Sequence, residues 1–269
     1  MIDFDPGYVA EPYISLCKDY ESAAYPSDAF RLEWGPIFHR GRLDGSARVL
    51  VIGQDPAAQE DMARRILVGT AGHRVQGFLA KLGITKSYVM LNTFAFSVLN
   101  QTGGEHNKTN IAIIAYRNRW FDAVLANGKV QAVVAFGDLA HDAWKRYLHA
   151  SGQAHTNLPF QAVRHPTWPE SSTAATHGDA AAVAAATATM LAQWNTAIVA
   201  LRQDGITTDT APQAAAYGSA FTPAELPAIP AADLPAGLPS WMTGSDGWAS
   251  RTGANAAEKR KTLTVVVPG

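Results

Sequence analysis

The stretch Arg48-Val49-Leu50-Val51-Ile52-Gly53-Gln54-Asp55-Pro56 decides the fold of this 269-residue chain. Its apolar, β-branched run predicts a strand that is buried on both faces, as in a parallel sheet. Asp55 comes just after Gly53 ends the strand, and open α/β sheets bind their ligands at this carboxyl edge. Asp55 is therefore the first candidate for chemistry, although an isolated Asp-Pro pair more often opens a turn or caps a helix.

Composition and charge predict a soluble globular protein. Hydrophobic residues make up 47% of the chain and charged residues 17%, and the net charge is −1, which neither demands nor excludes a nucleic-acid partner. The single cysteine, Cys17, excludes a disulfide framework and an all-cysteine iron–sulfur site, and it fits a reducing compartment. The sequence has no apolar run long enough for a bilayer and no positively charged signal at Met1–Asp5, so we expect a cytoplasmic protein without membrane contact.

Three more short apolar runs predict strands that alternate with helices. The strands are expected at residues 88–92, 131–137 and 160–165. Helices are expected at residues 69–83, 110–126, 138–149 (capped by Asp138) and 178–201. This alternation predicts an α/β protein with three layers, α/β/α, around a central four-stranded parallel sheet.

Both ends of the chain depart from this alternation. Residues 8–47 combine three prolines with spaced aromatic residues, so we expect residues 1–47 to form a helical cover over one edge of the core. After residue 204, six prolines between Pro212 and Pro239 argue against regular structure. Large apolar residues such as Trp248 nevertheless predict that this part packs on the core.

The predicted organisation is therefore an α/β/α domain at residues 1–204 and an Ala/Pro-rich C-terminal arm at residues 205–269. A small basic cluster, Lys259-Arg260-Lys261, lies near the end of the arm. Such a cluster is usually solvated, and phosphate contact is the alternative.

Polar side chains follow three of the predicted strands. Asp55, Asn92 and His165 each come at the carboxyl end of one, and in a parallel sheet these ends meet at the same edge. Each residue alone is more often structural. Together, a carboxylate, a carboxamide and an imidazole can supply a charge or base, a reader of hydrogen-bond patterns and a group that stabilises a developing anion.

The same residues carry a resemblance to a known family. Gly53-Gln54-Asp55-Pro56 and His165-Pro166-Thr167 resemble the two signature motifs of the uracil-DNA glycosylase superfamily. Asn92 matches the asparagine with which that family reads pyrimidines, and the similarity covers roughly residues 48–194. The segment at residues 67–72 is similar to the one that the thermostable iron–sulfur branch places after its water-activating motif.

The departures from the family pattern are specific. The thermostable branch needs four cysteines and this chain has one, so the resemblance implies a member without an iron–sulfur cluster, metal or other cofactor. Ala57 stands where the classical branch has the tyrosine that blocks the methyl group of thymine. Leu67 stands where the family stacks a phenylalanine on uracil, and Phe94 or Phe96 is expected to take over that role.

The resemblance also implies a mechanism. Asp55 is expected to orient the attacking water and to offset positive charge on the sugar, while His165 donates to uracil O2 together with backbone N–H groups near Gln54. Asn92 is expected to pair with both N3–H and O4 of uracil, which rejects cytosine. The partner would be DNA containing uracil, single- or double-stranded, bound by a monomer.

Excision from a duplex requires the nucleotide to be flipped out of the stack. Trp168 or Arg164 is expected to fill the gap, and a core role for Trp168 is equally compatible with the sequence. The residues expected to contact DNA are Arg164, Thr167, Trp168 and Ser171. Ser172, Arg64, Arg65 and Arg74 are further candidates for phosphate contact, each more typical of a solvated surface.

Two other functions stay open at this point. The chain could be a DNA-binding module that keeps the fold without turnover, or a glycosylase for thymine in mismatches, hypoxanthine or xanthine, since Ala57 does not exclude a larger base. An esterase-like hydrolase is poorly supported, because the sequence has no Gly-x-Ser-x-Gly motif.

Overall fold

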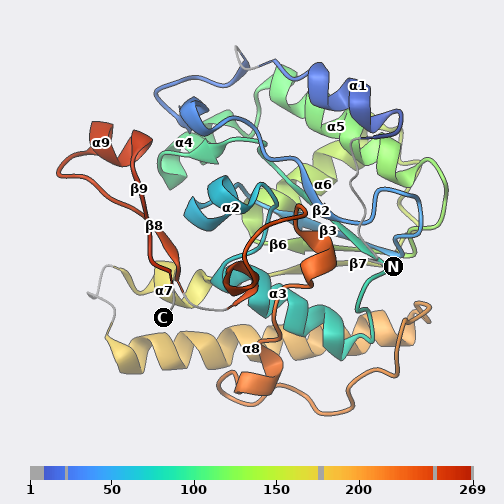
Figure 1. Ribbon diagram of the computed structural model, residues 1–269. Helices are drawn as coiled ribbons and strands as arrows, with labels where there is room; N and C mark the ends of the chain where they lie inside the picture. The colour runs from blue at the N-terminus through green and yellow to red at the C-terminus, as the bar shows by residue number, and fades with distance from the viewer. Residues whose placement is uncertain (1–8, 22–23, 175–178, 245–246, 268–269) are drawn as a thin grey trace.

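A computed structural model describes residues 9–21, 24–174, 179–244 and 247–267. Its centre is a five-stranded sheet in the order β2-β4-β3-β6-β7, with helices on both faces (Figure 1). Four of these strands run parallel, as predicted: β3 (Val49–Gly53), β4 (Tyr88–Asn92), β6 (Ala132–Phe136) and β7 (Phe160–Val163). The three-layer α/β architecture is confirmed.

The fifth strand was not predicted. β2 (His39–Gly41) pairs antiparallel with β4 at the edge of the sheet. Its sequence, His39-Arg40-Gly41, has no apolar run that would indicate a strand, yet both large side chains are 0% exposed. The sheet therefore has five strands rather than the predicted four.

The described part of residues 1–47 also differs from the predicted helical cover. It holds one short α-helix, α1 (Tyr13–Lys18), followed by β1 (Phe30–Arg31), the 3-10 turn η2 (Leu32–Trp34) and β2. Pro26 and Pro36 flank this region, and proline is poorly accepted inside a helix. The near-helical spacing of the aromatic residues there reflects packing of an irregular chain instead.

The remaining elements follow in chain order. The α-helices are α2 (Ala58–Ala63), α3 (Thr70–Lys81), α4 (Gln101–Asn107), α5 (Ile111–Leu125), α6 (Asp138–Ala150), α7 (Trp168–Ser172), α8 (Ala180–Gln203) and α9 (Ala256–Lys261). The 3-10 turns are η4 (Pro223–Glu225), η5 (Ala231–Asp233) and η6 (Ser240–Thr243), and the outer strands are β5 (Ser97–Val98), β8 (Ala249–Arg251) and β9 (Leu263–Val265). Asp138 is the first residue of α6 rather than its cap, because Gly137 takes the cap position with φ 94°. Gly178, the expected start of the long helix, lies outside the described residues.

Helices α3 and α8 cover one face of the sheet, and α1, α5 and α6 cover the other (Figure 1). Side chains along a strand alternate between the two faces. Tyr88 and Met90 of β4 belong to the core under α3 and α8, whereas Val89 and Leu91 belong to the opposite core. The same alternation places Asn92, at the end of β4, on the α3–α8 side.

The chain after residue 204 lies against the core in several places. Tyr217, Ile229, Leu234, Met242 and Trp248 are all less than 9% exposed. Asp233 forms a buried ion pair with Arg40 at 3.0 Å, and Glu225 pairs with Lys81 at 2.7 Å. These contacts agree with an arm that packs on the core, while the division at residue 204 stays a prediction. Within the described ranges, no helix is long and apolar enough to span a membrane.

The Arg40–Asp233 pair yields a first prediction, on stability. Asp233→Ala should lower the free energy of unfolding by about 3 kcal/mol, because it leaves a fully buried guanidinium without its carboxylate. Urea denaturation followed by circular dichroism measures the loss, and Asp28→Ala, at an exposed position, is the control. Equal stability of the two variants would show that Asp233 does not hold the arm to the core.

Candidate active site

A cleft of about 820 Å³ opens where β3 and β7 end. It brings together eight residues that the sequence analysis selected, namely Gln54, Asp55, Ala57, Arg164, His165, Thr167, Trp168 and Ser171. The cleft is also lined by residues that were not predicted to belong to the site, including Val98, Glu105, Asp138, His141 and Gln193. Two strand ends that are far apart in the sequence therefore contribute to one site.

Asp55 lies between β3 and α2, and its Oδ2 accepts a hydrogen bond from the backbone N–H of Val98 at 3.0 Å. Burial raises the pKa of the Asp55 carboxyl to about 7, and Glu60 acts in the same direction. The Val98 N–H, Arg31 and Arg251 oppose this rise in pKa. Near neutral pH the group is thus divided between its acid and carboxylate forms.

His165 follows β7 and is held by its own loop. Its Nδ1 accepts the backbone N–H of Thr167 at 3.3 Å and lies 3.0 Å from the Thr167 hydroxyl. A ring nitrogen that accepts an N–H carries no proton, so the neutral ring keeps its proton on Nε2. Burial, and then the charge of Arg74, lower the pKa of His165 to about 4, against a smaller opposing effect of Glu170. At neutral pH His165 is an uncharged hydrogen-bond donor.

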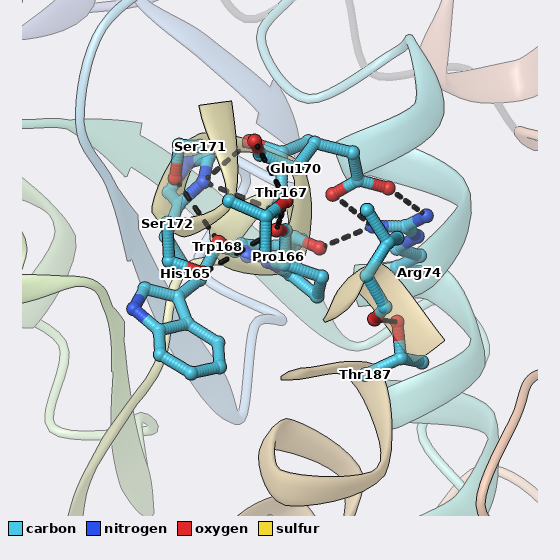
Figure 2. A network of polar contacts seen from close by, with 12 residues as sticks. Arg74, His165, Pro166, Thr167, Trp168, Glu170, Ser171, Ser172 and Thr187 are labelled. Carbon is cyan, nitrogen blue, oxygen red and sulfur yellow. Dashed lines mark hydrogen bonds and ion pairs between the residues drawn. The ribbon is translucent and has the colours of Figure 1, made fainter. Parts of the chain in front are cut away.

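Arg74 of α3 contacts the loop that follows His165 (Figure 2). Its guanidinium donates to the carbonyl of Pro166 at 2.6 Å and to both carboxylate oxygens of Glu170 at 3.0 and 2.6 Å. Arg64 likewise donates to the carbonyls of Trp34 and Pro36, each at 2.7 Å. These two arginines, candidates for phosphate contact from the sequence, bind the protein itself, and Arg65 is only 5% exposed.

Asn92 and Leu67 meet over Gly53, next to the cleft wall. Asn92 pairs in register with Gly53, and a Cβ on Gly53 would lie 2.3 Å from Asn92 Oδ1 and 3.6 Å from a methyl carbon of Leu67. Glycine is therefore required for the Asn92 amide to occupy this place. Asn92 Oδ1 is buried and has no hydrogen-bond partner among the described residues.

The Gln54 amide and His165 likewise both lie close to Gly137. A Cβ on Gly137 would lie 3.0 Å from Gln54 Nε2 and 3.2 Å from the Cβ of His165. Asn92 thus lies beside Gly53, whereas the Gln54 amide and His165 lie beside Gly137. Neither Asn92 nor Leu67 lines the main cleft; Asn92 borders a cavity of about 20 Å³ beside α5 instead.

Among the described residues, no phenylalanine lines the cleft. Phe94 and Phe96 are 0% and 1% exposed, and Phe94 packs on Phe30 with 5.2 Å between ring centroids. Their proposed contact with a base stays a prediction, and Leu67 lies closer to Gly53. Ala57 is exposed at the cleft and caps α2 through its N–H, which donates to Glu60 at 3.1 Å.

At the mouth of the cleft, the Arg164 guanidinium lies over the Trp168 ring, 4.1 Å from its centroid. Trp168 is partly buried and packs on the α3–α8 core, and Figure 2 shows its indole turned away from the Arg74 contacts. Ser171 is exposed one turn further along α7. Both roles considered for Trp168, core packing and DNA contact, agree with this position.

Among the described residues, no group of three or more His, Cys, Asp or Glu side chains is arranged to hold a metal ion. The positive charges that act on Asp55 come from Arg31 and Arg251. Because these arginines are remote from Asp55 in the sequence, no spacing or motif indicated their place near it.

The raised pKa of Asp55 predicts a stability change in Asp55→Asn. Folding raises this pKa from 3.8 to about 7, so the folded protein loses stability as the pH rises from about 4 to 7. Asparagine has no proton to lose, and the variant should be more stable than the wild type at pH 8, on the order of 2 kcal/mol given partial solvent access. Urea titrations at pH 4 and pH 8 measure this difference. A variant with the same relative stability at both pH values would contradict the raised pKa.

The family model of the uracil DNA glycosylase superfamily matches residues 40–195. The match is longer than half of the 269-residue chain and contains Asp55, Asn92 and His165. A search of curated proteins found no match to the chain. On the family match over this central sheet, the chain belongs to the uracil DNA glycosylase superfamily.

Proposed function

We propose that this protein is a DNA glycosylase that excises uracil by hydrolysing its N-glycosidic bond. One observation carries the proposal: Asp55 and an uncharged His165, with its proton on Nε2, line the same cleft. The family match supports a glycosylase acting on DNA, and the finer assignment to uracil rests on the residues around Gly53.

In the proposed reaction, Asp55 and His165 each stabilise one of the two charges that develop. As the bond between the sugar C1′ and uracil N1 breaks, positive charge builds on the sugar and negative charge on the base. The Asp55 carboxylate offsets the first and orients the water that adds to C1′, whose proton is released. His165 Nε2–H donates a hydrogen bond to uracil O2 and stabilises the anion without transferring its proton.

Recognition of uracil falls to Asn92. Its buried, unpartnered Oδ1 matches an incoming donor such as the N3–H of uracil, and its amide N–H matches the O4 acceptor. Cytosine has an acceptor at N3 and a donor at C4, so it would leave these buried groups unpaired, at a cost of roughly 1–3 kcal/mol for each.

A second candidate substrate class follows from Ala57. Because this residue is small and exposed at the cleft, nothing at this position blocks a methyl group or a larger base. Thymine in mismatches, hypoxanthine and xanthine are therefore tested beside uracil. A DNA-binding module without turnover is the third possible outcome.

Contact with DNA is assigned to the loop that follows β7. The paired Arg164 and Trp168 at the cleft mouth offer a cation and an aromatic surface, which can stack on a base or fill the gap that a flipped nucleotide leaves. Ser171 and Thr167 lie on the same rim and can donate to phosphate oxygens.

The proposal predicts uracil excision under single-turnover conditions. Matched oligonucleotides carry U, T, C, hypoxanthine or xanthine in single- and double-stranded form. We expect release of uracil, with a rate that rises with pH to about 7 as Asp55 ionises. Asp55→Asn and His165→Ala should each slow release at least 100-fold while both remain folded.

If a base other than uracil is released and both variants lose that activity, the glycosylase assignment stands and the released base replaces uracil as the substrate. No release of any base from DNA that still binds would refute the proposed activity. Unchanged rates in both variants would show that the cleft is not the active site.

A further prediction concerns Asn92→Asp. An ionised aspartate cannot donate to O4, so uracil release should slow and the preference for uracil over cytosine should fall at least tenfold. Rates with matched U and C substrates measure this preference, and Asn195→Asp, on α8 and away from the cleft, is the control. Unchanged selectivity would remove Asn92 from the recognition site.

A further inference from the structure

The C-terminal hairpin, residues 249–265, lies beside α2, the helix that follows β3 (Figure 1). Two arginines attach it to distant parts of the chain. Arg260 pairs with Glu33 at 2.8 Å and donates to the carbonyls of Ser27 and Phe30 at 2.5 and 2.9 Å. Arg251 points to α2 and β5 instead, which are the elements that flank Asp55.

Arg251 joins α2 to β5. It forms an ion pair with Asp61 of α2, whose side chain is 1% exposed, and donates to the hydroxyl of Ser97 at 3.0 Å. Ser97 is the neighbour of Val98, whose N–H holds Asp55 Oδ2 at 3.0 Å. The path from Arg251 to the Asp55 carboxylate therefore runs through two hydrogen bonds and one peptide unit.

Strand β5 depends on such support because it is only two residues long. On its other side it pairs with β1, and Arg31 of β1 donates to the carbonyls of Val98 and Leu99. Arg31 and Arg251 thus both hold the β5 segment through hydrogen bonds. Of the two, Arg251 is supplied by the C-terminal hairpin, beyond residues 40–195 of the family match.

We propose that Arg251 is a positioning residue for Asp55, which makes the C-terminal hairpin a working part of the active site. Arg251 holds the Ser97-Val98 segment against Asp55 and places a positive charge near the carboxylate. The effect of Arg251 on catalysis rests on the proposed function. Its effect on the position and ionisation of Asp55 does not.

The charges around Asp55 come from several elements. Glu60 of α2 favours its neutral form, whereas Arg31 of β1 and Arg251 of β8 favour the carboxylate. The other ionisable groups among the described residues that line the cleft are Glu105, Asp138, His141, Arg164 and His165. Removing Arg251 takes away one of two favourable cations, so the pKa of Asp55 should rise.

The experiment is a ¹³C NMR titration of side-chain carboxyls, with the Asp55 signal assigned from its loss in Asp55→Asn. In Arg251→Met we expect the Asp55 midpoint to rise by at least half a pH unit, about a threefold change in its ionisation constant. Arg251→Lys should restore part of the shift. Arg260→Met is the matched control, because Arg260 anchors the same hairpin but is not among the charges that act on Asp55.

Single-turnover rates give the second readout. If wild-type enzyme excises a base, Arg251→Met should be slower by at least about twofold at pH 7 and approach the wild-type rate at pH 9, where Asp55 is ionised in both. A merely structural defect would lower the rate equally at every pH. Ser97→Ala removes the acceptor through which Arg251 contacts β5 and leaves its Asp61 contact in place. It should shift the midpoint in the same direction, and it replaces Arg251→Met if that variant does not fold.

An unchanged Asp55 midpoint in Arg251→Met and Ser97→Ala would overturn the proposal. An equal shift in Arg260→Met would overturn it too, since the effect would then belong to hairpin docking in general. Wild-type protein that excises no base would refute the proposed function alone, and the titration would still decide the role of Arg251.

Discussion

The parallel pairing of β3 with both β4 and β6 is the constraint on which the rest of this structure depends. It sets Gly53 opposite Asn92, and Ile52 opposite Ala135, so that Gly137 follows beside Gln54. Gly53 leaves the space that the Asn92 amide occupies, and Gly137 leaves the space that the Gln54 amide and His165 occupy. A slip of one residue in either pairing would turn Asn92 to the opposite face or close this space. The core and the site are thus fixed by the same hydrogen bonds.

Burial shifts the two catalytic candidates in opposite directions, and in both it favours the neutral form. The pKa of Asp55 rises to about 7 and that of His165 falls to about 4. A neutral imidazole suits the proposed reaction, whereas a neutral carboxyl does not. Arg31 and Arg251 counter the burial of Asp55, and neither surrounds His165. The site therefore keeps a carboxylate whose ionised form is unfavourable there. The proposed reaction requires this carboxylate, whereas folding alone does not.

Most of the sheet and the cleft could be predicted from sequence because each is encoded locally. Runs of apolar residues indicated the four parallel strands, and polar residues at their ends indicated Asp55 and His165. Strand β2 was missed because its pairing, not its composition, makes it a strand. The roles of Arg74 and Arg251 were missed because each depends on a partner distant in the sequence, Glu170 and Asp61. Neither spacing nor residue type shows that an arginine faces a buried carboxylate rather than solvent.

The protonation state of His165 tests the account most directly, because the proposed reaction needs an uncharged donor facing the base. Protein labelled with ¹⁵N in histidine can be followed by NMR from pH 3 to pH 9, with the His165 signals assigned from His165→Ala. The account predicts a proton on Nε2 and none on Nδ1 throughout the neutral range, with a midpoint near pH 4. A His165 ring that titrates near pH 6.5, or that carries its neutral proton on Nδ1, would contradict it.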